Sequence, residues 1–575
     1  LRKEKKEMSK SYLKSFGVNA EMRLRRCKIS HHDTRDLTLA PGWLVPVYVK
    51  DVIPSDVWNM KEANMEVKQV IESIKPTFGD VYASVYYFFV PYRLLWKKFT
   101  DVFGKGQPSE WDTPTETVLP TAMFAAGLSA SSITTKATTG NGYDAVVNTC
   151  VQSGQSTPPV LVSQRYNLMD YLNYALTMVS NGSDVKIPVN WLHPAAYEKI
   201  WTDCFRDENV MNPDPDVTKC YEYAGGGDPL DVRFALHYAC KLKDVYTSCL
   251  PSPQKGSPVT VALGDNAPIV MKNTGTTLNL QSASPMYVKA EDPIPPGETR
   301  PTYVERTSAN ASYQLTGELF ADLSNAVGAT VNQVRFDFAM QRMKERDARG
   351  GTRYNEVMLS TFEAYNGDLA LQRPELLGGD TIQLNMTTVP STGANPGKLG
   401  GMSNTNVGTR PFVKTFGEMG VLMGVMCIRP RNMYKQGIPK FGLKTRRYHF
   451  YDPALNNIGD QPVYTCELYA LAGADAVFGF QEAWYEYRSN ENVVCADMRG
   501  GTTDMDAWSY ANNFATQPYL NADFKKQDGS SITKTLQGYN SSYPGYVYAV
   551  HFDFKPEVTS PMTPHSIPGL IDHII

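Results

Sequence analysis

Glu345 and Asp347 are a carboxylate pair that general acid–base chemistry could use. Such chemistry needs a carboxyl group whose pKa lies near the working pH. Cations surround this pair, and neighbouring positive charge holds a carboxylate ionised. The cations are Arg342, Lys344, Arg346 and Arg349. The pattern therefore indicates an ion-pair network rather than a catalytic acid.

Two further motifs could bind a phosphate or a metal ion, but both depart from the patterns that such sites need. Gly393–Lys398 reads GANPGK, yet the four-residue gap between glycines is missing and Leu399 replaces the Ser or Thr that binds magnesium. His31 and His32 are adjacent in a basic segment, where histidines are usually solvated. Neither HExxH nor GxSxG occurs. We expect no catalytic residue, no metal site and no cofactor.

Composition favours a β-rich protein with many loops. The 575 residues are 42% hydrophobic and 11% aromatic, which suffices for large cores, and 43 Gly and 38 Pro interrupt the chain throughout. Nine cysteines without a CxxC spacing indicate reduced, mostly buried thiols. No apolar run approaches the roughly 20 residues of a membrane span, and the N-terminus is charged where a signal peptide is apolar. We expect a protein that crosses no membrane by the usual route.

Basic residues are concentrated at the N-terminus. Residues 1–28 carry ten basic and three acidic residues, which gives +7. The whole chain has a formal charge of −3, so the remainder sums to −10. A basic arm on a mildly acidic body is typical of nucleic-acid contact, and a solvated, disordered terminus is the alternative.

Strand-like segments cluster towards the two ends of the chain. Near the start, Trp43–Val49 and Val81–Val90 are rich in β-branched and aromatic residues, and Pro46 indicates an edge position or a bulge. The later predicted strands are Val421–Ile428, Arg446–Tyr451, Val463–Leu471, Val493–Met498 and Tyr546–Phe554. Apolar residues at helical spacing predict short helices over Arg93–Phe103, Asn167–Val179, Pro194–Phe205 and Thr330–Lys344.

Long polar stretches separate these elements. They cover residues 104–164, 207–230, 251–328, 378–415 and 499–545 and are rich in Gly, Ser, Thr, Asn and Pro. Structureless loops of this length are uncommon inside a compact domain. They become reasonable if the loops contact neighbouring copies in an assembly.

Several blocks resemble the major capsid proteins of the Microviridae, closest to the gokushovirus branch. They include LAPGWLVPVYVKDVIPSD (39–56), VYASVYYFFVPYRLLW (81–96), IWTDCFRDENV (200–210), YTSCLPSPQKG (246–256), ERDARGGTRY (345–354), LQRPELLGG (371–379), VFGFQEAWYEYR (477–488) and IPGLIDHI (567–574). The blocks keep their order over most of residues 30–575. Residues 1–30 match little, so their role rests on charge alone.

The resemblance implies a mainly β fold, a viral eight-stranded antiparallel jelly roll with long loop insertions and a few short helices. It implies a structural protein, not an enzyme, that self-assembles into a T=1 icosahedral shell around single-stranded DNA. The four expected parts are a basic, partly flexible, interior-facing arm (1–40), the first part of the jelly roll with helical insertions (41–250), a polar surface protrusion at the three-fold axis (251–328), and the remaining jelly roll with inter-subunit loops and a C-terminal tail (329–575).

Two sets of residues are candidates for contacts in such a shell. DNA tethering is expected from Arg23, Arg25, Arg26 and Lys28 in the arm, which could instead only brace the inner wall. A subunit interface is expected from Arg342, Glu345, Arg346, Asp347, Arg349 and Arg353, since Arg supplies bidentate pairs that Lys cannot. An ion network within one subunit is the alternative for this second set.

The resemblance also implies partners and a location. The expected partners are further copies in a 60-copy shell of pentameric units, single-stranded DNA, a small basic DNA-binding protein, minor capsid proteins and a bacterial surface receptor. The expected location is the virion, assembled in the bacterial cytoplasm. The residues alone leave two alternatives open: a β-sandwich glycoside hydrolase with carboxylates in a loop-lined cleft, and a carbohydrate-binding module.

Overall fold

The computed structural model describes residues 26–99, 119–128, 149–150, 160–162, 167–174, 177–178, 185–223, 234–256, 269–271, 279–281, 314–316, 319–321, 331–349, 372–390, 399–409, 412–456, 458–500, 504–541 and 543–562. The chain divides into two compact units, of which Gln254–Arg346 is the smaller. This unit starts near the predicted insertion at 251 but extends further. Four short strands in it form two antiparallel pairs: β11 (Ile269–Met271) with β14 (Leu319–Ala321), and β12 (Asn279–Gln281) with β13 (Gln314–Thr316).

The larger unit contains a sheet of seven described strands whose pairings are all antiparallel. Its order is β1-β22-β4-β17-β16, with β2 paired to β22 and β18 to β4. The strands are β1 (Cys27–Ser30), β2 (Asp33–Leu39), β4 (Val57–Gln69), β16 (Met386–Pro390), β17 (Leu399–Thr409), β18 (Val413–Thr415) and β22 (Tyr548–Ser560). Buried and less buried side chains alternate along most of β22, as expected for a strand with one face on a core.

A second antiparallel sheet has the order β15-β5-β19-β3. Its strands are β3 (Val45–Val52), β5 (Val81–Pro91), β15 (Glu375–Gln383) and β19 (Gly420–Pro430). Every residue of β19 is buried, which requires cover on both faces. β3 lies at the edge, and its register with β19 shifts next to Pro46, which confirms both expectations for that proline.

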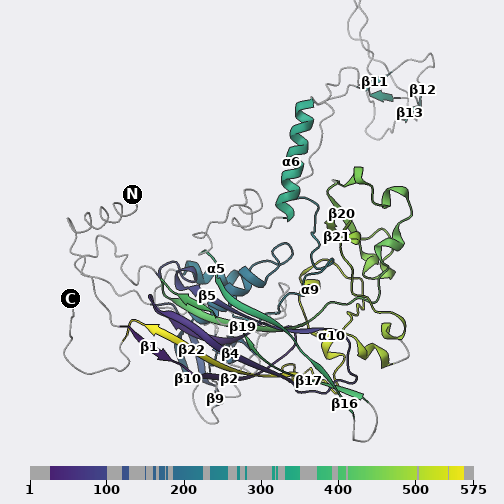
Figure 1. Ribbon diagram of the computed structural model, residues 1–575. Helices are drawn as coiled ribbons and strands as arrows, with labels where there is room; N and C mark the ends of the chain where they lie inside the picture. Colours follow the sequence, from purple (N-terminus) through teal and green to yellow (C-terminus); the bar gives the residue numbers. More distant parts are fainter. Residues whose placement is uncertain are drawn as a thin grey trace, which may run out of the picture. The chain divides into compact units, whose positions relative to one another are not determined.

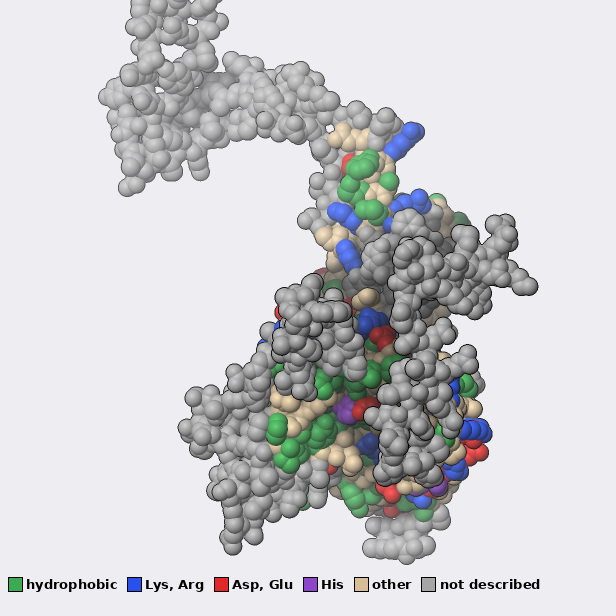
Figure 2. All heavy atoms as spheres, turned by 90° about the vertical axis from the view of Figure 1, so that its left-hand side faces the viewer, with side chains coloured by type: hydrophobic (Ala, Val, Ile, Leu, Met, Phe, Trp, Pro, Cys, Tyr) green, Lys and Arg blue, Asp and Glu red, His purple; other side chains and the backbone are tan. Residues whose placement is uncertain are grey.

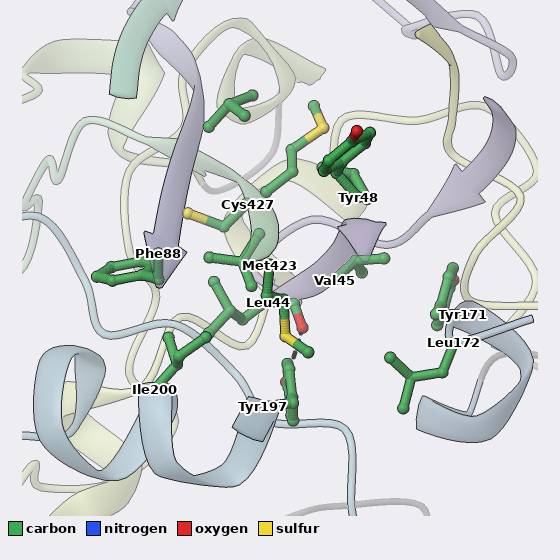
Figure 3. Close-up of a cluster of buried hydrophobic side chains, with 14 of the residues drawn as sticks. Leu44, Val45, Tyr48, Phe88, Tyr171, Leu172, Tyr197, Ile200, Met423 and Cys427 are labelled. Carbon is green, nitrogen blue, oxygen red and sulfur yellow. Dashed lines mark hydrogen bonds between the residues drawn. The ribbon is translucent and has the colours of Figure 1, made fainter. Parts of the chain in front are cut away.

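The two sheets pack face to face around one large apolar core. Figure 1 shows β5 and β19 lying over β4 and β22. On the other side of β19, helix α4 (Leu192–Ile200) packs against the sheet. Tyr197 and Ile200 point from α4 towards Met423 and Leu44, and the Tyr197 hydroxyl donates to the Leu44 carbonyl at 2.7 Å (Figure 3). Side chains from three layers thus share the core.

The helical insertion contains short elements between residues 119 and 223. A π-helical turn (Trp201–Phe205) continues α4, and α5 (Pro215–Glu222) begins with Asp214 as its N-cap. The same part of the chain forms a small sheet that contains β6 (Thr121–Leu128), β7 (Thr149–Cys150), β8 (Val160–Val162), β9 (Thr177–Met178) and β10 (Val185–Asn190). The insertion also contains α3 (Leu168–Tyr171), and the 19-residue α6 (Val331–Arg349) lies further along the chain.

The described residues between 431 and 541 form what we call the loop module. A second, smaller apolar core lies mostly within it and also includes Tyr246 and Cys249. The hairpin of the module joins β20 (Asp460–Tyr464) to β21 (Val477–Glu482), and its α-helical turns are α9 (Ala522–Lys525) and α10 (Ser530–Thr533). The 3-10 helices of this module lie at Lys440–Leu443, Arg447–His449, Pro453–Leu455, Thr465–Glu467, Ala470–Ala472, Tyr485–Tyr487, Ala496–Arg499 and Asp504–Trp508. Another 3-10 turn, Tyr92–Leu94, follows β5.

The mainly β sandwich confirms the expected fold class, and several local predictions are wrong. Within the described residues the two main sheets have seven and four strands, so the eight-strand detail of the expected jelly roll is not confirmed. The predicted loop 378–415 contains strands β15 to β18, and the predicted arm 1–40 contains β1 and β2, which pair with β22. Both segments are polar on one face, and this masked their strand character in the sequence.

Four other predicted elements differ for local reasons. The helix over Asn167–Val179 stops at Tyr171, because Asn173 adopts a left-handed conformation with φ 68°. The segment from Arg93 begins as a 3-10 turn, continues through turns and becomes helical at Phe99, and residues 100–103 of the predicted helix lie outside the described residues. The strand at Val463 ends at Tyr464, and the segment 446–451 is a 3-10 turn with exposed side chains. Val493–Met498 forms one bridge and then a 3-10 turn.

Candidate subunit and nucleic-acid interfaces

The arginines predicted at a subunit interface lie on or after α6. Arg342 and Arg346 are exposed, and Glu345 is half-buried and accepts a hydrogen bond from Gln341 at 2.9 Å. The side chain of Asp347 and all of Arg353 lie outside the described residues. The helix therefore presents three of the predicted cations on its surface, because Arg349 is exposed as well.

Arg349 has acidic partners that the sequence did not reveal. Its guanidinium pairs with the buried carboxylate of Asp460 and lies 3.9 Å from Glu482. These acids flank the β20–β21 hairpin, more than a hundred residues further along the chain, so no local pattern could identify them. For Arg349 an ion network exists within one subunit, and contact with another copy stays a proposal.

The arm residues predicted to hold DNA are only partly within the described structure. Arg23 and Arg25 lie outside it, and Arg26 is exposed. Lys28 is in β1, where its ammonium pairs with Glu557 at 2.7 Å, and Lys61 pairs with the same carboxylate. These two lysines lower the pKa of Glu557. Lys28 thus links β1 to β22 in addition to any contact with DNA.

His31 and His32 have separate partners. The ring of His31 stacks on Trp58, with centroids 6.4 Å apart. His32 hydrogen-bonds through Nε2 to Asp553 at 2.6 Å. The two rings are thus engaged with different strands, β4 and β22.

One buried cluster could hold a cation by its geometry. Ligand atoms of Glu198, Asp214 and His237 lie within 4.8 Å of one another. The structure also gives each of them a hydrogen-bonding role. Glu198 accepts from the Ala235 amide at 2.8 Å and hydrogen-bonds to His237 Nε2, and Asp214 accepts from the Asp216 amide as the N-cap of α5. We interpret the cluster as a structural network rather than a metal site.

Electrostatics within this cluster are unusual. The ring of His237 stacks on Trp201 at 4.0 Å, which fixes its orientation towards Glu198. Burial and the nearby carboxylate of Glu198 raise the pKa of Asp214 to about 7. The sequence contained no signal for this network because its members come from α4, the start of α5 and the segment after residue 233.

A second buried ion cluster joins the helical insertion to the loop module. Lys525 of α9 lies 3.1 Å from Asp207 and donates to the Thr247 carbonyl at 2.5 Å. Lys243 pairs with the same carboxylate at 2.9 Å. Opposing effects act on Asp207: burial raises its pKa, and the two lysines outweigh burial, so the pKa is lowered. These ion pairs connect residues that lie hundreds of positions apart in the sequence.

The cysteines of the described part form no disulfide. Cys220, Cys249, Cys427 and Cys466 are buried free thiols, whereas Cys204 and Cys495 are exposed. Burial raises the pKa of the Cys249 thiol to about 12, which makes it unreactive as a nucleophile. Among the described helices, none has the length and apolar character required to span a membrane.

Comparison with known proteins identifies the family to which this chain is similar. A family model described as capsid protein (F protein) matches residues 19–139 and 136–570. Capsid protein VP1 of Spiroplasma virus 4 is 29% identical over 598 residues, covering 98% of this chain and 99% of the relative. Capsid protein VP1 of Bdellovibrio phage phiMH2K is 29% identical over 92% of both chains, and that of Chlamydia phage 1 is 24% identical over 95% of this chain and 96% of its own. The chain therefore belongs to the phage capsid protein (F protein) family of the Microviridae and is a major capsid structural protein.

Proposed function

We propose that this capsid protein assembles as a T=1 shell of 60 copies, in pentameric units, around a single-stranded DNA genome. The proposal rests on one observation: the match to capsid proteins covers nearly the whole chain, loops included. A sandwich that carries a large loop module and a helical insertion offers many surfaces for contacts between copies. Many modest contacts sum to a stable closed assembly. The role is structural and not enzymatic.

Electron microscopy of the expressed chain tests this assembly. We expect negative-stain images to show closed shells or pentameric pieces of one size, because interfaces of a T=1 shell repeat identically. A chain that stays a stable monomer at high concentration contradicts the proposal. The same sample should lack hydrolytic activity on polysaccharides, which separates the capsid role from the glycoside hydrolase and carbohydrate-binding alternatives.

The positive charge of the arms limits how much of the genome's phosphate charge they can neutralise. Sixty arms of +7 contribute about 420 positive charges, or about 300 if the chain starts at Met8. A genome that encodes these 575 residues exceeds 1725 nucleotides, with one phosphate each. The arms neutralise at most about a quarter of that charge. Polyamines, metal ions or a small basic DNA-binding protein must therefore share the interior.

Replacing Arg23, Arg25, Arg26 and Lys28 together with Gln tests the arm. We expect less DNA per assembled particle and weaker salt dependence of DNA release, because non-specific tethering depends on phosphate neutralisation. Since Lys28 also pairs with Glu557, the matched control is Lys61→Gln, which weakens the same carboxylate's pairing without touching the arm. Unchanged DNA content and unchanged salt dependence would leave the arm as a brace of the inner wall only.

The remaining proposals concern the exterior and the host. We propose that residues 251–328 project outward at the three-fold axis and contribute to attachment to a bacterial surface receptor. Minor capsid proteins join the shell, and assembly takes place in the bacterial cytoplasm. The compact unit Gln254–Arg346 is consistent with a separate protrusion. The cluster of Arg342, Glu345, Arg346, Asp347, Arg349 and Arg353 is proposed to contact a neighbouring copy.

A further inference from the structure

The loop module presents a group of exposed aromatic and basic side chains that its own core does not use. We call it the aromatic–arginine surface; it consists of Phe441, Arg446, Arg447, Tyr448, Phe450, Tyr451 and Tyr487. Tyr448 is 75% and Phe441 is 74% exposed. All of residues 445–454 are exposed. Exposed aromatic groups of this extent mark interaction sites in soluble proteins.

A buried tryptophan contacts the rings at the centre of this surface and fixes their positions. Trp484 is buried and has φ 65°, a left-handed conformation that is rare and strained for a large side chain. Its indole donates to the Leu455 carbonyl at 3.1 Å and meets Tyr451 edge to face at 5.7 Å. Tyr451 in turn contacts Tyr487 at 6.1 Å. The strained tryptophan therefore fixes two exposed tyrosines in one orientation.

A buried cation supports the same rings. The ammonium of Lys444 lies 4.0 Å from the Tyr487 ring centroid and 5.7 Å from that of Phe450. Glu486 neutralises it at 2.8 Å, and both side chains are almost fully covered. The surface is thus preorganised, which lowers the entropy lost when a partner binds.

Two charges of the surface have no partner in the described part of the chain. Arg446 and Arg447 are exposed, and neither side chain forms an ion pair or a hydrogen bond with a described residue. Several half-buried cations of the described chain do have acidic partners, as Lys414 has Glu375 and Arg93 has Glu418. On the face shown in Figure 2, acidic, basic and apolar side chains of the described residues are likewise interspersed. Two adjacent uncompensated arginines indicate an acidic partner.

Aromatic rings with arginines can bind either a protein surface or single-stranded DNA. Other exposed side chains of the loop module favour a protein as the binding partner. The same loop module exposes aliphatic side chains, Leu471 at 84%, Ile458 at 54% and Val477 at 49%. Aliphatic side chains can bury apolar surface against a protein partner. They have no aromatic ring on which a nucleic-acid base can stack. Outside residues 1–28 this chain sums to −10, so another copy offers the acidic charge that the arginines require.

We propose that the aromatic–arginine surface docks onto an acidic, partly apolar surface of a second copy of this chain. Aromatic and Arg side chains dominate the buried centres of such interfaces. This inference rests on the proposed shell and names a surface through which its copies join. It names residues that the interface proposed around α6 does not include.

Charge reversal and truncation test the surface in the full-length chain. Arg446→Glu with Arg447→Glu, and Tyr448→Ala with Phe450→Ala, should each lower particle yield at least tenfold in sedimentation. The melting temperature of the unassembled chain should stay unchanged, because these side chains lie outside the core. The matched control is Tyr519→Ala, an aromatic residue exposed to a similar degree but outside the surface, which should assemble as the wild type.

Photo-crosslinking identifies the occupant directly. Tyr448→p-benzoylphenylalanine in assembled particles should yield covalent chain–chain dimers after irradiation. Crosslinks to DNA in place of dimers, or normal particle yield in both double variants, would overturn the inference. Failure of the wild-type chain to form any particle would instead contradict the proposed function, so the two failures are distinguishable.

Discussion

Asp207→Ala is expected to lower the free energy of unfolding of the full-length chain by about 3–5 kcal/mol. The ammonium of Lys525, 3% exposed, lies 3.1 Å from the Asp207 carboxylate. Burial already lowers the pKa of Lys525. Without Asp207, its described partners are two backbone carbonyls, of Thr247 and Cys249, which leave the buried charge uncompensated. Urea unfolding of the unassembled chain, followed by tryptophan fluorescence, measures the loss.

Two variants test whether the loss of stability comes from an uncompensated buried charge or from a general loss of contacts. Lys243 pairs with the same carboxylate but is 64% exposed, so Lys243→Gln should cost less than about 1 kcal/mol. Adding Lys525→Met to Asp207→Ala should restore much of the lost stability, because no charge then remains buried. Equal losses in Asp207→Ala and Lys243→Gln would contradict this explanation.

The sequence predicted the central strands of the sandwich well. Val81–Val90 and Val421–Ile428 are apolar on both faces, and the structure buries them between the other sheet and α4. It missed β4, β15 and β17, whose exposed residues are mostly polar or Gly, although Leu376 and Met402 are exposed as well. In these strands the pairing partners supply the stability, and pairing between distant segments leaves no local pattern in the sequence.

The candidate interfaces were predicted only in part. Charge density identified the arginines near α6 and the basic arm, because local runs of cations are visible in a sequence. Asp460 as a partner of Arg349, and the contacts of Lys444 beneath Tyr487, depend on chain segments that only the fold brings together. The segment 446–451 was interpreted as a strand because its rings resemble a β pattern, and its exposure in the structure gives those rings a different role.

Asp214 makes stability depend on pH in the neutral range. Its carboxyl group faces Glu198, Asp216, His237 and the Cys220 thiol, and Lys219 pairs with Asp216 nearby. Burial and Glu198 raise its pKa from 3.8 to about 7 in the folded chain. Between these values the folded state binds a proton that the unfolded state has released. Stability from this group therefore falls as pH rises from about 4 to 7 and is constant above that range.

Asp214→Asn should remove this penalty and keep the helix cap, since Asn and Asp cap helices equally well. One pKa unit corresponds to about 1.4 kcal/mol, so the variant should gain up to about 4 kcal/mol over wild type at pH 8 and little at pH 4. Urea midpoints at pH 4, 5, 6, 7 and 8 measure the difference. Asp214→Ala, which loses the cap as well, should gain less at every pH. A pH-independent difference between Asp214→Asn and wild type would show that this carboxyl group does not titrate in the folded chain near neutrality, and that the hydrogen bond from the Asp216 amide holds it ionised despite Glu198.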